Sequence, residues 1–202
     1  MIRDIYSDAD AFTITSQSLA EEGIEVEIGK SLLTDDELDC EKVVILRPDE
    51  WYNTKRMNNP PRSTDGIIFV DQQSKYHMYV IELKSSRLAD LNRNHIQEKF
   101  NTIFQKFLAE DFSYLFDNEL KPYELKTLHL WLVCDPLRLR NRATTREEFI
   151  QLATASKSKM RTLMANYALG FKPASFRGIR AQIIPMLSPP IIEVDQFIDP
   201  LS

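Results

Sequence analysis

Three charged side chains in the centre of the chain could do chemistry together: Asp65, Glu82 and Lys84. Asp65 begins the β-rich run 65–71, and Glu82 and Lys84 end the run 76–84, with a short polar turn between the runs. If Asp71 and Tyr76 close a hairpin, paired residue numbers sum to 147, which places Asp65 opposite Glu82. Directly opposed residues point to one face of a sheet. Lys84 shares that face because side chains alternate with a period of two.

Two carboxylates placed this close repel each other unless a cation lies between them. Oxygen ligands suit Mg²⁺, which takes one or two protein carboxylates and keeps several waters, and we expect Mn²⁺ to substitute for it. A neighbouring lysine can orient or deprotonate a metal-bound water and stabilise negative charge on a transferring phosphoryl group. The pattern therefore predicts phosphodiester hydrolysis. Alternatively, Asp65 is a turn acid and Glu82 and Lys84 form a solvated strand end, and a different turn length or a bulge would separate them.

The elements that would position these residues form an α/β domain. The run 76–84 is apolar on both faces over most of its length, which predicts helices on both sides of the sheet. Ser7 could cap a helix through about Glu22. The remaining pattern predicts strands at 24–33, 42–47, 127–134 and 181–187, a polar loop at 49–64, a helix at 93–110, and a helix from the capping box Thr145–Glu148 to about Gly170.

The predicted organisation is one domain over residues 1–202, an α/β fold with a mixed central β-sheet flanked by helices on both faces. Within it we distinguish an acidic N-terminal region (1–50), a core (about 42–135), a basic helical region (136–180) and an acidic tail (188–202). Neither an internal repeat nor a low-complexity linker divides the sequence.

Asp65, the hairpin, Glu82-Leu83-Lys84 and the following helix resemble the core of the PD-(D/E)XK nuclease superfamily, which includes restriction endonucleases, junction resolvases and defence nucleases. The resemblance covers about residues 42–135 and is most specific over 65–100. It implies a restriction-endonuclease-like core in which Asp65 and Glu82 bind Mg²⁺, the Leu83 carbonyl adds a ligand, and Lys84 activates or positions the water. Thr64 stands where many members have proline, at a position that tolerates change.

The resemblance also implies further site residues. Many members place a glutamine near the site in the helix after the motif, and Gln97 is the matching candidate, with Lys99 beside it; alternatively, Gln97 is an exposed helix residue. Many members also carry an upstream acid on an N-terminal helix. The sequence does not choose among the candidates, which are Glu21, Glu22, Glu37 and Glu41.

The charge is distributed unevenly along the chain. The net charge is −5, but residues 1–50 carry −10 and residues 136–180 carry +8. Such asymmetry indicates a polyanion-binding region. Arg138, Arg140 and Arg142 directly follow the predicted strand 127–134, and we expect them to contact nucleic-acid phosphates. The alternative is a solvated helix face with ion pairs to the acidic N-terminal region.

The composition excludes several classes of protein. With 43% hydrophobic and 27% charged residues the chain is globular and not disordered. No apolar run is long enough to span a membrane, and the acidic N-terminus does not predict a secretory signal. The two cysteines form neither a disulfide framework nor a zinc site. We expect a cytoplasmic protein.

Two hypotheses on function follow. In the first, the chain is a Mg²⁺-dependent endonuclease that hydrolyses DNA, with RNA as the alternative substrate, as a restriction, defence or repair enzyme. A homodimer is the assembly that this hypothesis suggests, because one chain holds one candidate site. In the second, it is a non-catalytic or partner-dependent nucleic-acid-binding subunit of a larger complex.

Overall fold

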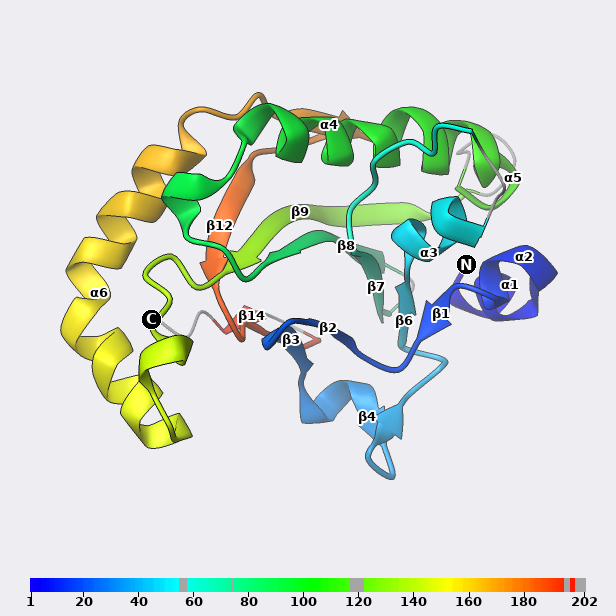
Figure 1. Cartoon of the computed structure of the whole chain (residues 1–202). Coiled ribbons are helices and arrows are strands. Elements are labelled where there is room, and N and C mark those ends of the chain that lie inside the picture. Colours follow the sequence, from blue (N-terminus) through cyan, green and yellow to red (C-terminus); the bar gives the residue numbers. More distant parts are fainter. Residues whose placement is uncertain (55–57, 74, 117–121, 195–196, 199–202) are drawn as a thin grey trace.

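A mixed β-sheet forms the centre of the computed structural model, which describes residues 1–54, 58–73, 75–116, 122–194 and 197–198 (Figure 1). Among these residues six strands pair in the order β1-β6-β7-β8-β9-β12. Neighbours from β1 to β8 are antiparallel, whereas β8, β9 and β12 are parallel to one another. The strands are β1 (Thr15–Ser16), β6 (Val43–Leu46), β7 (Gly66–Gln72), β8 (Lys75–Lys84), β9 (Glu124–Cys134) and β12 (Ile183–Leu187). The prediction of an α/β fold with a mixed sheet is confirmed.

The hairpin of β7 and β8 has the predicted register. Its pairs run from Gly66 opposite Ile81 to Gln72 opposite Lys75, and every pair sums to 147. Gln73 follows β7 with a positive φ of 55°, a left-handed conformation that suits a tight hairpin turn. Asp65 immediately precedes the first ladder pair, so the register brings it to the end of β8.

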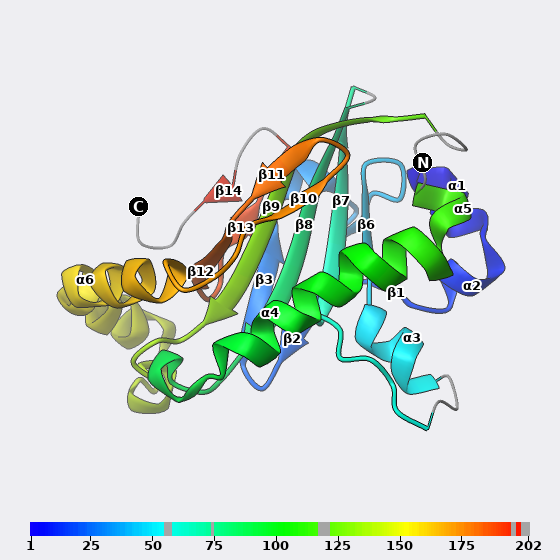
Figure 2. The same cartoon turned by 90° about the horizontal axis from the view of Figure 1, so that it is seen from above.

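Helices cover one face of this sheet (Figure 2). Helix α4 (Arg93–Thr102) continues directly into the π-helical segment η3 (Ile103–Asp111), which confirms the helix predicted at 93–110. Phe100, Ile103 and Phe107 are fully buried in the core on this face. The other helices contributing to this core are α1 (Ile2–Ser7), α2 (Ala9–Phe12), α3 (Pro48–Thr54), α5 (Ser113–Phe116) and α6 (Arg146–Ala168), the last of which packs beside β12.

The opposite face is covered by short strands, so the prediction of helices on both faces is wrong. A small sheet in the order β14-β13-β3-β2 packs there, and Val26 and Ile192 join Trp131 of β9 in a second core. A strand that is buried on both faces requires an apolar layer on each side, and that layer need not be a helix. Here the apolar side chains on one face of β3 form the second layer. The short elements on this side are β2 (Leu19–Glu21), β3 (Ile24–Ile28), η1 (Lys30–Leu32), β4 (Leu33–Thr34), β5 (Glu37–Leu38), β13 (Ile191–Ile192) and β14 (Phe197–Ile198).

The predicted N-terminal helix is also wrong. Asp8, and not Ser7, caps a helix here, since its side chain accepts hydrogen bonds from the amides of Asp10 and Ala11, and α2 ends after one turn. The chain then forms β1 and β2, and Gly23 (φ 77°) lies in the turn between β2 and β3. The apolar residues of this stretch are therefore divided between the two cores.

The C-terminal half follows the sequence pattern more closely. Thr145 caps α6 by accepting a hydrogen bond from the Glu148 amide, as the capping box predicts, and β12 is an edge strand. The predicted loop at 49–64 differs, because its first residues belong to α3. The remaining elements are η2 (Leu88–Asp90), η4 (Arg140–Arg142) and the hairpin of β10 (Ala174–Phe176) and β11 (Ile179–Ala181).

Candidate functional site

Two carboxylates lie buried side by side where β7 begins and β8 ends. Asp65 is 5% exposed and Glu82 is fully buried. The Leu83 amide donates a hydrogen bond of 2.6 Å to Asp65 Oδ2, which holds this carboxylate against the end of β8. Ionised groups are rarely buried unless they are paired or bind a cation. A buried acidic pair at a strand end is therefore a candidate functional site.

Two lysines neutralise this pair. The Nζ atoms of Lys84 and Lys99 lie 2.5 Å and 2.7 Å from Glu82 Oε1, and Lys99 Nζ is 3.8 Å from Asp65 Oδ1. Lys84 Nζ also donates to the Leu83 carbonyl oxygen, at 2.7 Å. The predicted convergence of Asp65, Glu82 and Lys84 is thus present, and α4 adds Lys99 to it.

Burial and the neighbouring charges shift the pKa values of the groups at this site. Burial, and then the negative charge of Asp65, raise the pKa of Glu82 to about 7, although Lys99 and Lys84 act in the opposite direction. Burial lowers the pKa of Lys84, but the charges of Glu82 and Asp65 outweigh it, so that this pKa lies above its ordinary value. Lys84 therefore keeps its proton at neutral pH, whereas Glu82 is only partly ionised without additional positive charge.

The oxygen atoms present fit a hard divalent cation. Glu82 Oε2 is buried and has no hydrogen-bond partner among the described residues. The Lys84 ammonium bridges Glu82 Oε1 and the Leu83 carbonyl oxygen, so these oxygens already share one positive charge. In the described part of the chain, groups of three or more His, Cys, Asp or Glu side chains suited to a metal are absent. Two carboxylates and a carbonyl match Mg²⁺, which retains waters, better than a closed zinc site.

Of the four upstream acids, Glu21 lies within electrostatic range of the pair. It ends β2, and burial followed by the charge of Asp65 raises its pKa, while Lys84 and Lys99 lower it. Glu22 accepts a hydrogen bond from Ser85 just beyond the site. The other two are elsewhere: Glu41 pairs with Arg3, and Glu37 is exposed in β5. The acid comes from a strand and not from the helix that the resemblance implied.

Gln97 does not reach the carboxylates. Its side-chain amide donates to Asn101 Oδ1 (3.2 Å), and its amide oxygen accepts from the Lys172 backbone N–H (2.8 Å). Residues two apart on a helix point about 200° apart, so Gln97 and Lys99 cannot both face the site. The sequence placed Lys99 beside the candidate, but nothing in the helical pattern distinguished the two.

The three arginines after β9 lie in different surroundings. Arg138 is half-buried in the turn after β9, with a positive φ of 52°. Arg140 lies over the Phe149 ring (5.0 Å) and pairs with Glu25 at 3.7 Å. Arg142 is exposed. Arg140 and Arg142 line different pockets.

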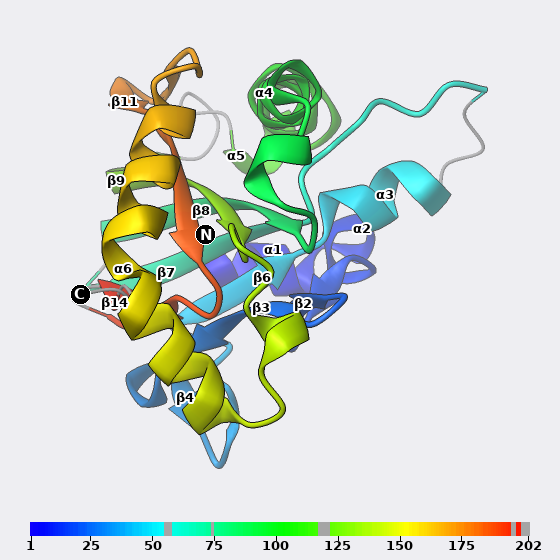
Figure 3. The same cartoon turned by 60° about the vertical axis from the view of Figure 1, so that its left-hand side comes forward.

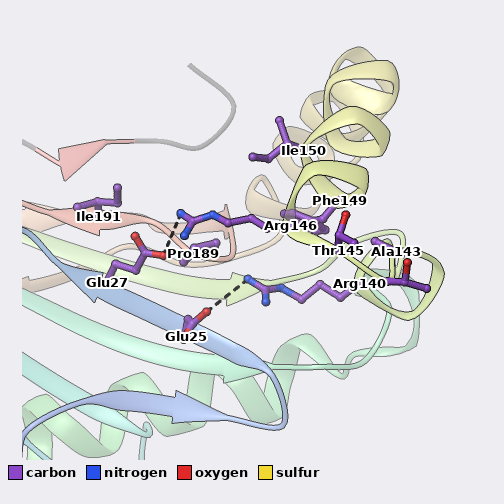
Figure 4. Close-up of a pocket in the computed structure, with 11 residues that line it drawn as sticks. Glu25, Glu27, Arg140, Ala143, Thr145, Arg146, Phe149, Ile150, Pro189 and Ile191 are labelled. Carbon is purple, nitrogen blue, oxygen red and sulfur yellow. Dashed lines mark hydrogen bonds and ion pairs between the residues drawn. The ribbon is translucent and has the colours of Figure 1, made fainter.

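Ion pairs join the basic region to the acidic N-terminal region around a pocket of about 480 Å³ (Figure 4). Arg140 reaches Glu25, and Arg146 Nη2 lies 3.5 Å from Glu27 Oε1. For Arg140 and Arg146, ion pairing with the first fifty residues is thus the observed arrangement. Part of the charge asymmetry is therefore engaged in ion pairs within the protein.

A comparison with protein-family models, with curated proteins and with solved structures finds no match to this chain. The interpretation of the site therefore depends on its own residues and geometry. None of the helices in the described ranges combines the length and the apolar character that crossing a membrane requires.

Proposed function

We propose that this protein is a divalent-metal-dependent nuclease with a restriction-endonuclease-like core, and that it hydrolyses phosphodiester bonds in DNA. The observation that carries the proposal is the buried pair Asp65 and Glu82 with Lys84 and Lys99 against it. Four converging charged side chains at the edge of an apolar sheet have a high desolvation cost. Buried charges with shifted pKa values are typical of functional sites.

Asp65, Glu82 and the Leu83 carbonyl are the groups that would hold Mg²⁺ or Mn²⁺. The bound ion supplies a nucleophilic water and polarises the phosphoryl oxygens. Because Glu82 Oε2 is buried without a partner, the carboxylate keeps a free lone pair for this purpose. The bound cation would favour the ionised form of Glu82, since a nearby positive charge lowers the pKa of an acid.

The lysines act as fixed positive charges. Lys84 holds its proton because Glu82 and Asp65 raise its pKa against the effect of burial, so its role is to donate hydrogen bonds and not to abstract a proton. Its ammonium can orient the attacking water and stabilise charge on the phosphoryl oxygens. Lys99 shares the same carboxylates from α4 and adds a second charge on the substrate side.

A cleavage assay tests this proposal. Plasmid, single-stranded DNA and RNA are incubated with the protein in Mg²⁺, in Mn²⁺ and in excess chelator. We expect metal-dependent cleavage that Asp65→Asn and Glu82→Gln each reduce by at least 100-fold, since each removes a metal ligand. Glu124→Gln is the matched control, because Glu124 is an exposed glutamate at the far end of β9. Undiminished cleavage by the two site variants would overturn the proposal.

The second candidate is a non-catalytic, partner-dependent nucleic-acid-binding subunit of a larger complex. The direct ion pairs of Glu82 with Lys84 and Lys99 favour it, because lysines that satisfy the carboxylates leave less need for a metal. Calorimetry with Mg²⁺ and Mn²⁺ on the protein alone separates the two candidates. Metal binding that Glu82→Gln abolishes supports the nuclease, and absence of binding supports the subunit.

The setting of the proposed nuclease is a reducing compartment. Cys40 is exposed and Cys134 is buried, and both are free. A cytoplasmic location agrees with free thiols. A homodimer would supply the second cut that cleavage of a duplex requires, and sedimentation with and without duplex DNA tests this assembly.

A further inference from the structure

A second pocket, of about 540 Å³, lies between the start of α4 and the face of α6. We call it the basic pocket. Its polar rim carries Arg87, Arg93, Arg142 and Lys159, and its lining includes the apolar side chains of Leu137 and Leu163. None of the described residues that line it is acidic. It is a different cavity from the pocket that Glu25 and Glu27 line on the other side of α6.

The described part of the chain places no acidic partner against most of the cations of the basic pocket. Arg87, Arg142 and Lys159 have no ion-pair partner among the described residues, in contrast to Arg140 and Arg146. The guanidinium of Arg93 packs over the Tyr167 ring, 4.4 Å from the ring centroid. This contact fixes the position of the guanidinium but does not neutralise its charge. Several uncompensated cations around one concavity concentrate anions there. The pocket is therefore suited to a strongly anionic ligand.

The basic pocket lies at the same edge of the sheet as the two carboxylates. Arg87 follows Lys84 by three residues, so their Cα atoms are at most about 11 Å apart. Pro136 and Leu137 of the lining follow β9, whose last residue, Cys134, pairs with Lys84. The loop after β9 and the segment between β8 and α4 line this pocket together with α6, whose position beside the sheet is seen in Figure 3. A nucleic-acid strand held at the carboxylates would therefore extend toward Arg87 on the rim of this pocket.

We propose that the basic pocket binds a phosphate of the nucleic-acid strand next to the phosphate that is hydrolysed. This inference rests on the proposed nuclease function and names the part of the substrate that positions it. Arginine and lysine bind phosphate oxygens through charge-assisted hydrogen bonds, and the walls formed by Leu137 and Leu163 accommodate the sugar or the base. The phosphate is either an internal diester or a terminal monoester, and both present the same oxygen atoms.

The test uses Arg142→Gln/Lys159→Gln, because both side chains are exposed and neither belongs to the carboxylate site. Lys30→Gln/Lys126→Gln removes two exposed lysines outside the pocket and is the matched control. Binding of short labelled oligonucleotides is measured by fluorescence anisotropy in chelator, where no cleavage occurs. The oligonucleotides carry a 5′-phosphate, a 3′-phosphate or no terminal phosphate. The salt dependence of binding is measured over roughly 50–200 mM salt.

We expect the pocket variant to bind roughly 10- to 100-fold more weakly than the wild type. We also expect its log–log salt slope to be shallower by about 1 to 2. A wild-type preference for a terminal phosphate that the variant loses identifies the monoester, and equal losses on all oligonucleotides identify the diester. Unchanged affinity and slope in a protein that still cleaves would overturn the basic pocket alone. Failure of the wild type to bind any oligonucleotide would overturn the pocket and the substrate together. Absence of metal-dependent cleavage, with binding intact and weakened by the pocket variant, would overturn the nuclease and the placement of the pocket beside a hydrolysed phosphate, but not the binding of phosphate in the pocket.

Discussion

The most informative perturbation of this molecule is Glu82→Gln, measured as stability without metal. Burial and then Asp65 raise the pKa of Glu82 from 4.5 to about 7 in the folded protein. The folded state therefore binds a proton more tightly than the unfolded state between these two values. This contribution to stability is fully present below about pH 4.5 and is lost as the pH rises through 7. Glutamine has the same shape and no proton to lose, so the variant lacks this fall in stability.

The magnitude follows from the size of the shift. One pKa unit corresponds to about 1.4 kcal/mol, so the wild type loses on the order of 3 kcal/mol between pH 4.5 and 8 through Glu82 alone. For a chain of this length, each kcal/mol changes the melting temperature by roughly 2–4 °C. The variant should therefore gain about 6–12 °C relative to the wild type over this range.

The assay is thermal and urea denaturation in chelator from pH 4.5 to 8, repeated at pH 8 with Mg²⁺. Glu124→Gln controls for the removal of an exposed carboxylate. At pH 8, Mg²⁺ at 100 times its dissociation constant should stabilise the wild type by about 2.7 kcal/mol and leave Glu82→Gln unchanged. Parallel curves for wild type and Glu82→Gln in chelator would refute the reasoning about burial and Asp65, and an equal Mg²⁺ effect on both would refute the ligand assignment.

Three further predictions concern the surroundings of the site. Lys99→Gln should slow DNA cleavage by roughly 10- to 100-fold, whereas Gln97→Ala should slow it by less than about threefold in the same assay. A larger loss of cleavage in Gln97→Ala than in Lys99→Gln would contradict the assignment of Lys99. Burial and then the charge of His77 lower the pKa of His129 to about 4. The free energy of unfolding should therefore fall as the pH decreases from 6.5 to 4. His129→Phe should remove about 2 kcal/mol of that fall in urea titrations, a value reduced to allow for the partial exposure of His129. Thr145→Ala should lower the free energy of unfolding by about 1 kcal/mol in thermal denaturation, because α6 loses its N-terminal cap. A decrease below about 0.3 kcal/mol, the size of an ordinary surface substitution, would show that Glu148 compensates for the lost cap.

Part of the candidate site could be predicted because it depends on local pattern. The register of β7 and β8 follows from a two-residue turn and the period of two along a strand, and this alone places Asp65 at Glu82. Likewise, the apolar spacing in 93–110 and the box at Thr145 mark helices through neighbours three or four residues apart. These features require no knowledge of distant parts of the chain.

The tertiary structure decided which segments that lie far apart in the sequence contact each other at the site. It selected Lys99 over Gln97, because the rotation of α4 is fixed by packing Ile96 and Phe100 into the core. It brought Glu21 to the site and covered one face with β2 and β3, because those strands bury their apolar side chains against β8 and β9. It also brought Arg140 and Arg146 to acidic partners, whereas Arg87, Arg142 and Lys159 of the basic pocket have no acidic partner within the described ranges. Local periodicity determines which elements form and in what register, whereas only long-range packing determines which charged side chains meet.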